Sequence, residues 1–282
     1  MSFAGKLFRF FIYSNLFIAL CAVLMVYQTC EILLHTEPST YFIAFVFFAT
    51  ICSYSFHWYL TPVDIEIPSP RTQWLSQNKN VHVVMFFTGL AGVAVSGFFL
   101  LDHWYWLLFS AFITFLYSAP KIPHPYFKAL RRVALAKTIF LAFVWMYVTT
   151  ILPLLISDQP WRTDFSLFAA GRFFLIYSIC ILFDYRDREY DKSVGIRSLI
   201  TWLSDKSITQ LFIVSLLLFV TFSCVLFLYR FSYGVIILLL IPGVITACLY
   251  RYAKKNFSDM LYYFVLDGLM ALSSLLTLLL IA

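Results

Sequence analysis

The chain has 282 residues, of which 62% are hydrophobic and only 12% charged, with a net charge of +6. A mean hydropathy of +0.87 excludes a water-soluble globular protein, because apolar runs of about 20 residues recur along the whole length. The positive charge follows the loops between these runs, so it does not indicate nucleic-acid binding. The six cysteines form no CxxC pair, which favours buried free thiols over a zinc site.

We predict an all-α, multi-span membrane bundle of about nine transmembrane helices, forming a single integral-membrane domain over residues 1–282. The first apolar run is too long for a signal-peptide core and lacks a cleavage site, so it is retained as a span. Proline and glycine mark several span ends, and Pro242 is among them. The expected spans are about 9–34, 40–60, 81–100, 103–119, 132–156, 165–186, 207–229, 233–250 and 258–281.

Basic residues gather on one side of these spans. That side holds the N-terminus and the segments 61–80, 120–131, 187–206 and 251–257, and it carries all of the 20 Lys and Arg residues except Arg162, Arg172 and Arg230. By the positive-inside rule this side is cytoplasmic. We therefore expect a cytoplasmic N-terminus and, with nine spans, an external C-terminus, most simply in a bacterial cytoplasmic (inner) membrane.

The loop after the second span, residues 54–74, is polar and rich in proline. His57 and Trp58 at a membrane boundary are most often interfacial anchors. Asp64, Glu66 and Arg71 are candidates to line a site, although two acids alone are a weak signal.

A basic segment follows the fourth span. It begins at Tyr117-Ser-Ala-Pro-Lys121 and continues through Lys128, Arg131, Arg132 and Lys137. For most of these residues a positive-inside anchor explains the charge equally well. Lys137 lies about one turn inside a span, where an ammonium group needs a partner or an aqueous cavity. We predict that Lys121 and Lys137 bind phosphate.

Isolated polar residues also occur inside spans, namely Asn15, Glu31, Arg172 and Asp267. Intramembrane charges are functional candidates by default. Glu31 is close to the outer interface, and we expect Arg172 and Asp267 to form a structural pair between helices.

The densest polar stretch begins at the end of the sixth span, from Asp184 to Ser198, and contains Asp184, Asp187, Glu189 and Asp191. On a helix, spacings of three and seven place Asp184, Asp187 and Asp191 within about 60° of one another. Three carboxylates on one face require a cation, whereas we expect Arg186 and Arg188 to point elsewhere. Carboxylate oxygens suit Mg²⁺, which commonly bridges to substrate phosphates. The ordinary alternative is a solvated helix end.

This stretch resembles the second aspartate-rich motif of UbiA-type intramembrane prenyltransferases, D-x-x-D-x-E-x-D-x-x-x-G-I-x-[ST]. Both the acids and the following Gly195-Ile-Arg-Ser198 match, and the segment after Tyr117 is similar to the family's connection between its fourth and fifth helices. The family's first motif, near N-D-x-x-D-x-x-x-D after the second span, is absent. Either His57, Asp64, Glu66 and Arg71 provide a variant first site, or the chain has departed from prenyl transfer.

The resemblance implies Mg²⁺-dependent transfer of a prenyl group from an isoprenoid diphosphate to an aromatic or other lipophilic acceptor. It implies Asp184, Asp187 and Asp191 as catalytic residues and metal ligands. For substrate binding we predict a larger set of mainly basic residues: Lys121, Lys137, Arg131, Arg197, Lys192, Arg71, His57, Asp64 and Tyr117.

Three other functional classes are alternatives to prenyl transfer. A degenerate UbiA-like membrane scaffold or lipid-binding subunit would explain the missing first motif. A transporter lacks support, because no inverted repeat or pair of Gly-interrupted helices is evident. The sequence Asp267-Gly268 imitates the start of a CDP-alcohol phosphotransferase signature, but Leu272 replaces its arginine.

Overall fold

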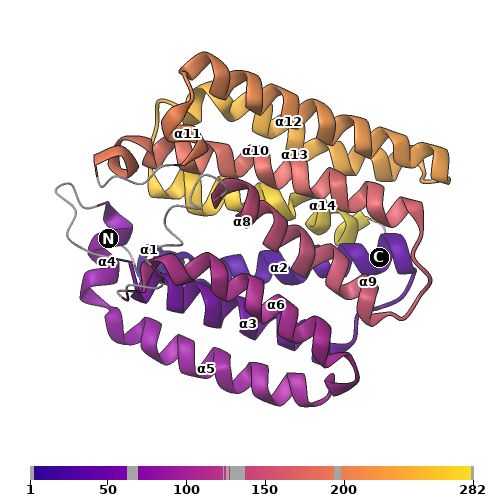
Figure 1. Ribbon diagram of the computed structural model, residues 1–282, viewed down its shortest axis with the longest axis horizontal. Helices are drawn as coiled ribbons and strands as arrows, with labels where there is room; N and C mark the ends of the chain where they lie inside the picture. The colour runs from indigo at the N-terminus through magenta and orange to yellow at the C-terminus, as the bar shows by residue number, and fades with distance from the viewer. Residues whose placement is uncertain are drawn as a thin grey trace.

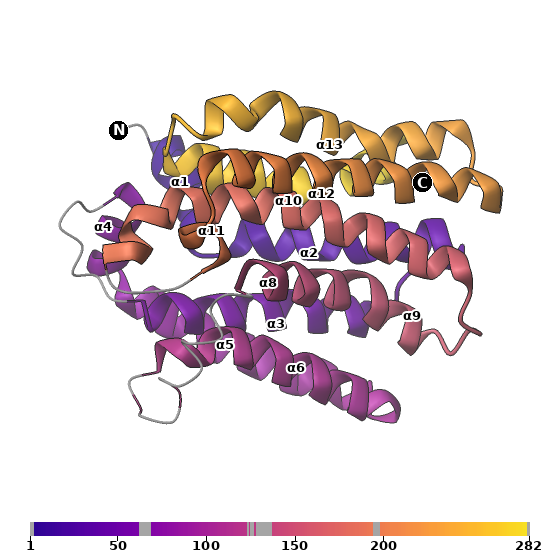
Figure 2. The same ribbon diagram turned by 45° about the horizontal axis from the view of Figure 1, so that its top comes forward.

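The computed structural model describes residues 3–61, 69–122, 124, 127, 137–193 and 198–280. Within these residues the regular structure is entirely helical, and the long helices run side by side (Figures 1 and 2). Eight helices are long and apolar enough to cross a membrane. The predicted multi-span helical bundle is therefore confirmed.

The N-terminal part of the chain, residues 3–121, contains the helices that precede the basic segment. They are α1 (Phe3–Tyr13), α2 (Leu16–Thr29), the π-helical turn η1 (Cys30–Leu34), α3 (Thr40–Tyr59), α4 (Pro70–Gln77), α5 (Lys79–Phe98), η2 (Leu101–His103), α6 (Trp104–Ser118) and η3 (Ala119–Lys121).

The C-terminal part contains the acid-rich helix and those around it. These are α8 (Lys137–Met146), the π-helical turn η5 (Tyr147–Ile151), α9 (Leu152–Ile156), α10 (Thr163–Ser193), α11 (Leu199–Trp202), α12 (Asp205–Val225), η6 (Leu226–Tyr229), α13 (Tyr233–Ala253), the π-helical turn η7 (Leu261–Leu266) and α14 (Asp267–Leu280).

The predicted fourth span, 103–119, corresponds to α6, which has 15 residues. At 1.5 Å per residue it is about 23 Å long, shorter than the roughly 30 Å hydrocarbon core of a bilayer. Helix α1 and the C-terminal end of α14 nevertheless lie at opposite ends of the bundle (Figures 1 and 2), as an odd number of crossings requires.

The first predicted span, 9–34, is divided, and that boundary was wrong. The chain turns at Asn15, which has a left-handed backbone conformation with φ of 70°, and the membrane-spanning run begins at Leu16. Asparagine tolerates this conformation better than most residues. Helix α1 before the turn is amphipathic and exposes Phe3 and Leu7, which suits a helix lying at the membrane surface.

Helix α10 is the most deeply buried span and α5 the least. In both views α10 lies in the middle, with α12 and α13 on one side and α3, α5 and α6 on the other (Figures 1 and 2). Helix α10 accordingly packs against α8, α12, α13 and α14.

The short helices α1, α4 and α11 lie at one end of the bundle (Figures 1 and 2). Helix α4 begins at Pro70, and the Ser69 hydroxyl accepts a hydrogen bond from the Thr72 backbone N–H over 3.2 Å. Pro242 was expected near a span end but lies inside α13. Membrane helices tolerate such a proline, and one turn further along the Thr246 hydroxyl donates to the Pro242 carbonyl.

Candidate functional site

The acid-rich stretch is helical as predicted, since α10 continues to Ser193. Asp184 and Asp191 are both buried, with 6% and 3% of their surfaces exposed. The Asp187 side chain is 38% exposed. Two of the three carboxylates are thus enclosed by the bundle, and the third lies at its edge.

Lys137, the first residue of α8, supplies a cation for the two buried carboxylates. Its Nζ lies 3.7 Å from Asp184 Oδ1 and 4.0 Å from Asp191 Oδ2. The Thr138 hydroxyl donates to the other oxygen of Asp184. Burying an ion pair is tolerable only when charges and hydrogen bonds are matched in this way. The predicted need of Lys137 for a partner is confirmed.

Asp187 is also paired, which corrects one expectation. Arg186 was expected to point away from the acids, yet its Nε donates to Asp187 Oδ1 over 2.8 Å, and its Nη2 donates to the Tyr263 hydroxyl. A guanidinium is long enough to fold back onto the next residue when Tyr263 holds its far end. Arg188 does point elsewhere, to Asp205.

Lys121 and His57 form a second polar cluster between η3 and α3. Lys121 Nζ lies 2.7 Å from His57 Nε2 and donates to the Thr61 hydroxyl over 2.6 Å. His57 Nδ1 lies 3.2 Å from the Ser118 hydroxyl, and Tyr117 stacks on the imidazole at 5.0 Å. Three residues predicted to bind substrate, His57, Tyr117 and Lys121, are therefore brought together.

The charge of Lys121 depends on this enclosure. Burial, together with the nearby charge of Lys137, lowers the pKa of the Lys121 ammonium from its ordinary 10.5 to about 7. Asp187 and Asp191 act in the opposite direction, and Arg71 acts in the same direction as Lys137. Lys121 thus senses charges from α4, α8 and α10, which places it in one electrostatic cluster with the acids.

Arg71 occupies a cage of aromatic rings. Only 4% of its surface is exposed, and its guanidinium carbon lies 4.1 Å from the Trp58 ring centroid and 4.0 Å from that of Tyr263. Its Nη2 donates to the Asn15 side chain over 3.1 Å. Trp58 also contacts Lys121, at 5.7 Å from the ring centroid, so this indole connects the two basic groups.

Other predicted site residues are not part of this assembly. Lys192 bonds Glu189 on an exposed surface, at 2.9 Å. Asp64, Glu66, Arg131 and Arg197 lie outside the described residues.

Several residues of the site were not predicted. Trp58 was interpreted as an interfacial anchor, and nothing in the sequence distinguishes Thr138 or Tyr263. Asn15 carried a usable signal, being an isolated polar residue in an apolar run. In the structure it accepts from Arg71 and donates to the Ser55 hydroxyl.

The predicted pair of Arg172 and Asp267 is wrong. Among the described residues, the Arg172 guanidinium donates to neutral oxygens, belonging to the Met25 and Thr149 carbonyls and the side chains of Gln28, Thr29 and Thr150. The π-helical turn η5 includes Thr149 and Thr150. Asp267 instead experiences the charges of Arg71 and Arg186.

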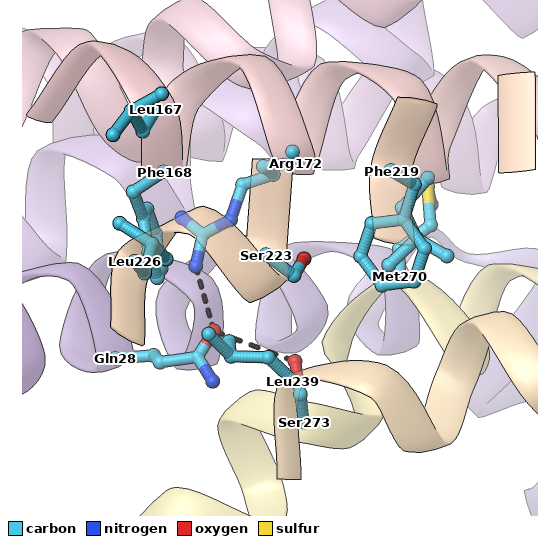
Figure 3. A pocket seen from close by; sticks show the side chains of 12 residues that line it. Gln28, Leu167, Phe168, Arg172, Phe219, Ser223, Leu226, Leu239, Met270 and Ser273 are labelled. Atoms are coloured by element: carbon cyan, nitrogen blue, oxygen red, sulfur yellow. Dashed lines mark hydrogen bonds between the residues drawn. The ribbon is translucent and has the colours of Figure 1, made fainter. Parts of the chain in front are cut away.

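Arg172 borders a cavity of about 20 Å³ between α10, α12 and α14, with room for about one water molecule. Figure 3 shows the guanidinium directed at Gln28, which also accepts from Ser273. The surrounding side chains are mostly apolar. This cluster fits a structural polar contact better than a substrate site.

The arrangement of the carboxylates bears on metal binding. Within the described part of the chain, no group of three or more His, Cys, Asp or Glu residues is placed to hold a metal ion. The ammonium of Lys137 lies where an ion bridging Asp184 and Asp191 would bind, and Asp187 is held by Arg186. These three carboxylates do not fit a single Mg²⁺ site while Lys137 is in place.

Comparison with known proteins gives one match. A family model described as the UbiA prenyltransferase family matches residues 68–275, which is well over half of the chain. No curated protein and no solved structure matches it.

Proposed function

The chain belongs to the UbiA prenyltransferase family, and from this membership we propose that it transfers a prenyl group from an isoprenoid diphosphate to a lipophilic acceptor inside the membrane. A multi-pass membrane protein suits this reaction, because both the prenyl chain and the acceptor partition into lipid. The observation that supports the proposal best is the clustering of Lys121, Arg71 and Lys137 beside the acids of α10. Such a cluster is suited to a diphosphate.

The chemistry requires little covalent participation from the protein. The allylic C–O bond breaks and its electron pair leaves with the diphosphate, and the acceptor carbon then bonds to the allylic cation and loses a proton. Basic side chains that meet the diphosphate oxygens stabilise the negative charge that develops on the leaving group. Trp58 and Tyr263 hold Arg71 at this end of the bundle, because aromatic faces attract cations.

The family membership also implies a divalent metal, and Mg²⁺ remains part of the proposal. When bound, such an ion adds positive charge against the diphosphate. Asp187 is the most accessible of the predicted ligands. We also propose that the protein resides in a bacterial inner membrane with the acids facing the cytoplasm.

The alternative proposal is a UbiA-like scaffold or lipid-binding subunit without catalysis. The salt bridges of Lys137 favour it, because they offset part of the charge of the buried acids without a substrate or metal. The two proposals differ in whether diphosphate is released.

A substitution of Asp187 tests the catalytic proposal. We expect Asp187→Asn and Asp184→Asn each to lower diphosphate release at least a hundredfold, a loss typical of removing charged groups that act in a transition state. The purified protein is incubated with Mg²⁺, labelled prenyl diphosphates of several chain lengths and a panel of aromatic acceptors, and free diphosphate is measured.

Asp158→Asn is the matched control, because Asp158 lies in the loop before α10 and asparagine suits its left-handed backbone. Its activity should equal that of the wild type. Unchanged turnover in both α10 variants would refute the assignment of these carboxylates, and an inactive wild type across all substrates would favour the scaffold.

A further inference from the structure

The two buried acids of α10 are neutralised by the protein itself. Lys137 Nζ lies within 4.0 Å of one oxygen from each of Asp184 and Asp191. Asp191 Oδ2 is buried and has no hydrogen-bond donor within normal distance among the described residues. The ammonium therefore provides charge balance without tight hydrogen bonding, as a cation between two carboxylates would.

A diphosphate entering this end of the bundle would meet less negative charge than the sequence suggests. Without Lys137, the carboxylates of Asp184 and Asp191 would repel the phosphate oxygens through a medium of low dielectric constant. With Lys137, the three side chains together carry one negative charge.

Lys121 and Arg71 differ from Lys137, because the groups that bond their charged ends are neutral. The described residues occupy two of the three donors of the Lys121 ammonium, through His57 and Thr61. His57 is itself fixed by Ser118 and Tyr117. The ammonium is therefore held in place with donor capacity remaining.

Arg71 provides an independent observation. Its Nε is buried and finds no acceptor among the described residues, and its charged end is held by Asn15 and by two aromatic faces. A buried donor without an acceptor is costly unless a ligand completes it. Arg186, which also contacts Tyr263, has a buried Nη1 that finds no acceptor among the described residues.

We propose that Lys137 takes the place of a metal ion between Asp184 and Asp191, and that Lys121 and Arg71 bind the diphosphate directly. The inference rests on the proposed function, since it concerns the same substrate. It adds that diphosphate binding by this chain does not require a divalent cation. Lys137 acts as a positioning and neutralising residue, and Lys121 and Arg71 contact the ligand.

The test measures binding with and without metal. Purified wild-type protein in detergent is titrated with inorganic diphosphate and, separately, with farnesyl thiolodiphosphate, each in EDTA and in excess Mg²⁺. The wild-type dissociation constants should differ less than threefold between the two conditions. Tighter binding of the farnesyl probe than of inorganic diphosphate distinguishes an isoprenoid substrate from a free diphosphate.

Variants separate the roles of the lysines. Lys137→Ala should bind at least tenfold more weakly than wild type in EDTA and recover in Mg²⁺, because the freed carboxylates can then hold the ion. Lys121→Met should lose at least tenfold in both conditions. Lys206→Met, an exposed lysine at the start of α12, should bind like the wild type.

Each other outcome has a definite meaning. Wild-type binding that disappears in EDTA and returns with Mg²⁺ would overturn this inference and leave the proposed function standing. Binding of neither probe in either condition would overturn the proposed function itself. If Lys137→Ala matches the wild type throughout, Lys137 is not the substitute for a metal. Should that variant fail to fold, the comparison of wild-type binding in EDTA and in Mg²⁺ is enough to test whether diphosphate binding requires a divalent cation.

Discussion

Lys121 contacts His57 on α3. It also lies among charged groups from other elements: Arg71 on α4, Lys137 on α8, and Asp187 and Asp191 on α10. Its pKa of about 7 means that near neutral pH the ammonium and amine forms are both populated. A bound diphosphate favours the ammonium, so binding above pH 7 is accompanied by proton uptake.

This linkage predicts a pH dependence of diphosphate affinity. Above pH 7 the affinity of the wild type should fall by up to about tenfold per pH unit, because a growing fraction of Lys121 must first be protonated. The Lys121→Arg variant keeps its positive charge over this pH range, so the part of the affinity loss that comes from Lys121 should be absent. Calorimetric titrations from pH 6.5 to 9 in EDTA measure the diphosphate affinity of both proteins. Because protonation of the ligand itself affects both equally, the difference between the two pH profiles reports on Lys121. If the affinities of the wild type and of Lys121→Arg fall in parallel as the pH rises, Lys121 is not the group responsible for the pH dependence.

Residue chemistry predicted some of these contacts from sequence but not others. The need of Lys137 for a partner was predicted from its place in an apolar run, but the sequence did not identify the α10 acids as that partner. The partner of Arg172 did not, because carbonyl oxygens freed near π-helical turns leave no trace in side-chain identity. Arg172 was therefore paired with Asp267 in the prediction, whereas Asp267 experiences the charges of Arg71 and Arg186.

Two helices at the edge of the bundle approach unusually closely. A Cβ built on Gly89 of α5 would lie 2.8 Å from the Cys52 backbone nitrogen and 2.9 Å from the Phe48 carbonyl oxygen, both on α3. Small residues allow this approach between membrane helices. At Gly97, farther along α5, the nearest atoms are Phe45 ring carbons at 3.7 Å, which is ordinary contact.

These two glycines form a matched pair. Gly89→Ala should destabilise the protein by about 1–3 kcal/mol, because backbone atoms of α3 must move apart. Gly97→Ala should be neutral or slightly stabilising, since alanine is the better helix former. Thermal unfolding in detergent measures both. An equal loss in the two variants would show that close packing at Gly89 is not the cause.

Helix boundaries show where sequence patterns stop being informative. Nearly every side chain in the spans is apolar, so no amphipathic stripe marks where one helix ends. The break at Asn15 was therefore missed, whereas the predicted span 233–250, which runs through Pro242, matches α13. The extension of α10 to Ser193 was recoverable, because three acids at helical spacing are a pattern that apolar runs lack.

For the whole molecule, composition was sufficient to predict the class of fold. The site depends on which helices pack together, and composition does not predict that. Runs of about 20 apolar residues permit little besides a helical bundle in a membrane. The meeting of η3, α3, α4 and α10 at one end cannot be read from any segment alone. Asp64 and Glu66 lie outside the described residues, so a rebuilt first acidic site remains a prediction.

The orientation of the bundle can be tested with cysteine variants. The exposed native Cys224 and Cys248 are first replaced by serine. Gln159→Cys, in the loop before α10, should react with a membrane-impermeant maleimide added to intact cells that express the protein. Lys206→Cys, at the opposite end, should react only after permeabilisation, because the positive-inside rule places it in the cytoplasm. The reverse labelling pattern would contradict the predicted orientation.

Arg172 also bears on how the protein is made. A span with a charge well inside it enters lipid poorly alone. Its acceptors on α2 and η5 precede it in the chain, and synthesis proceeds from the N-terminus. They are therefore already in the bilayer when α10 leaves the ribosome. Ser274 and Thr277, which bond Gln28, arrive last and close the arrangement. The order of helices along the chain thus lets α10 insert as a partner of earlier helices.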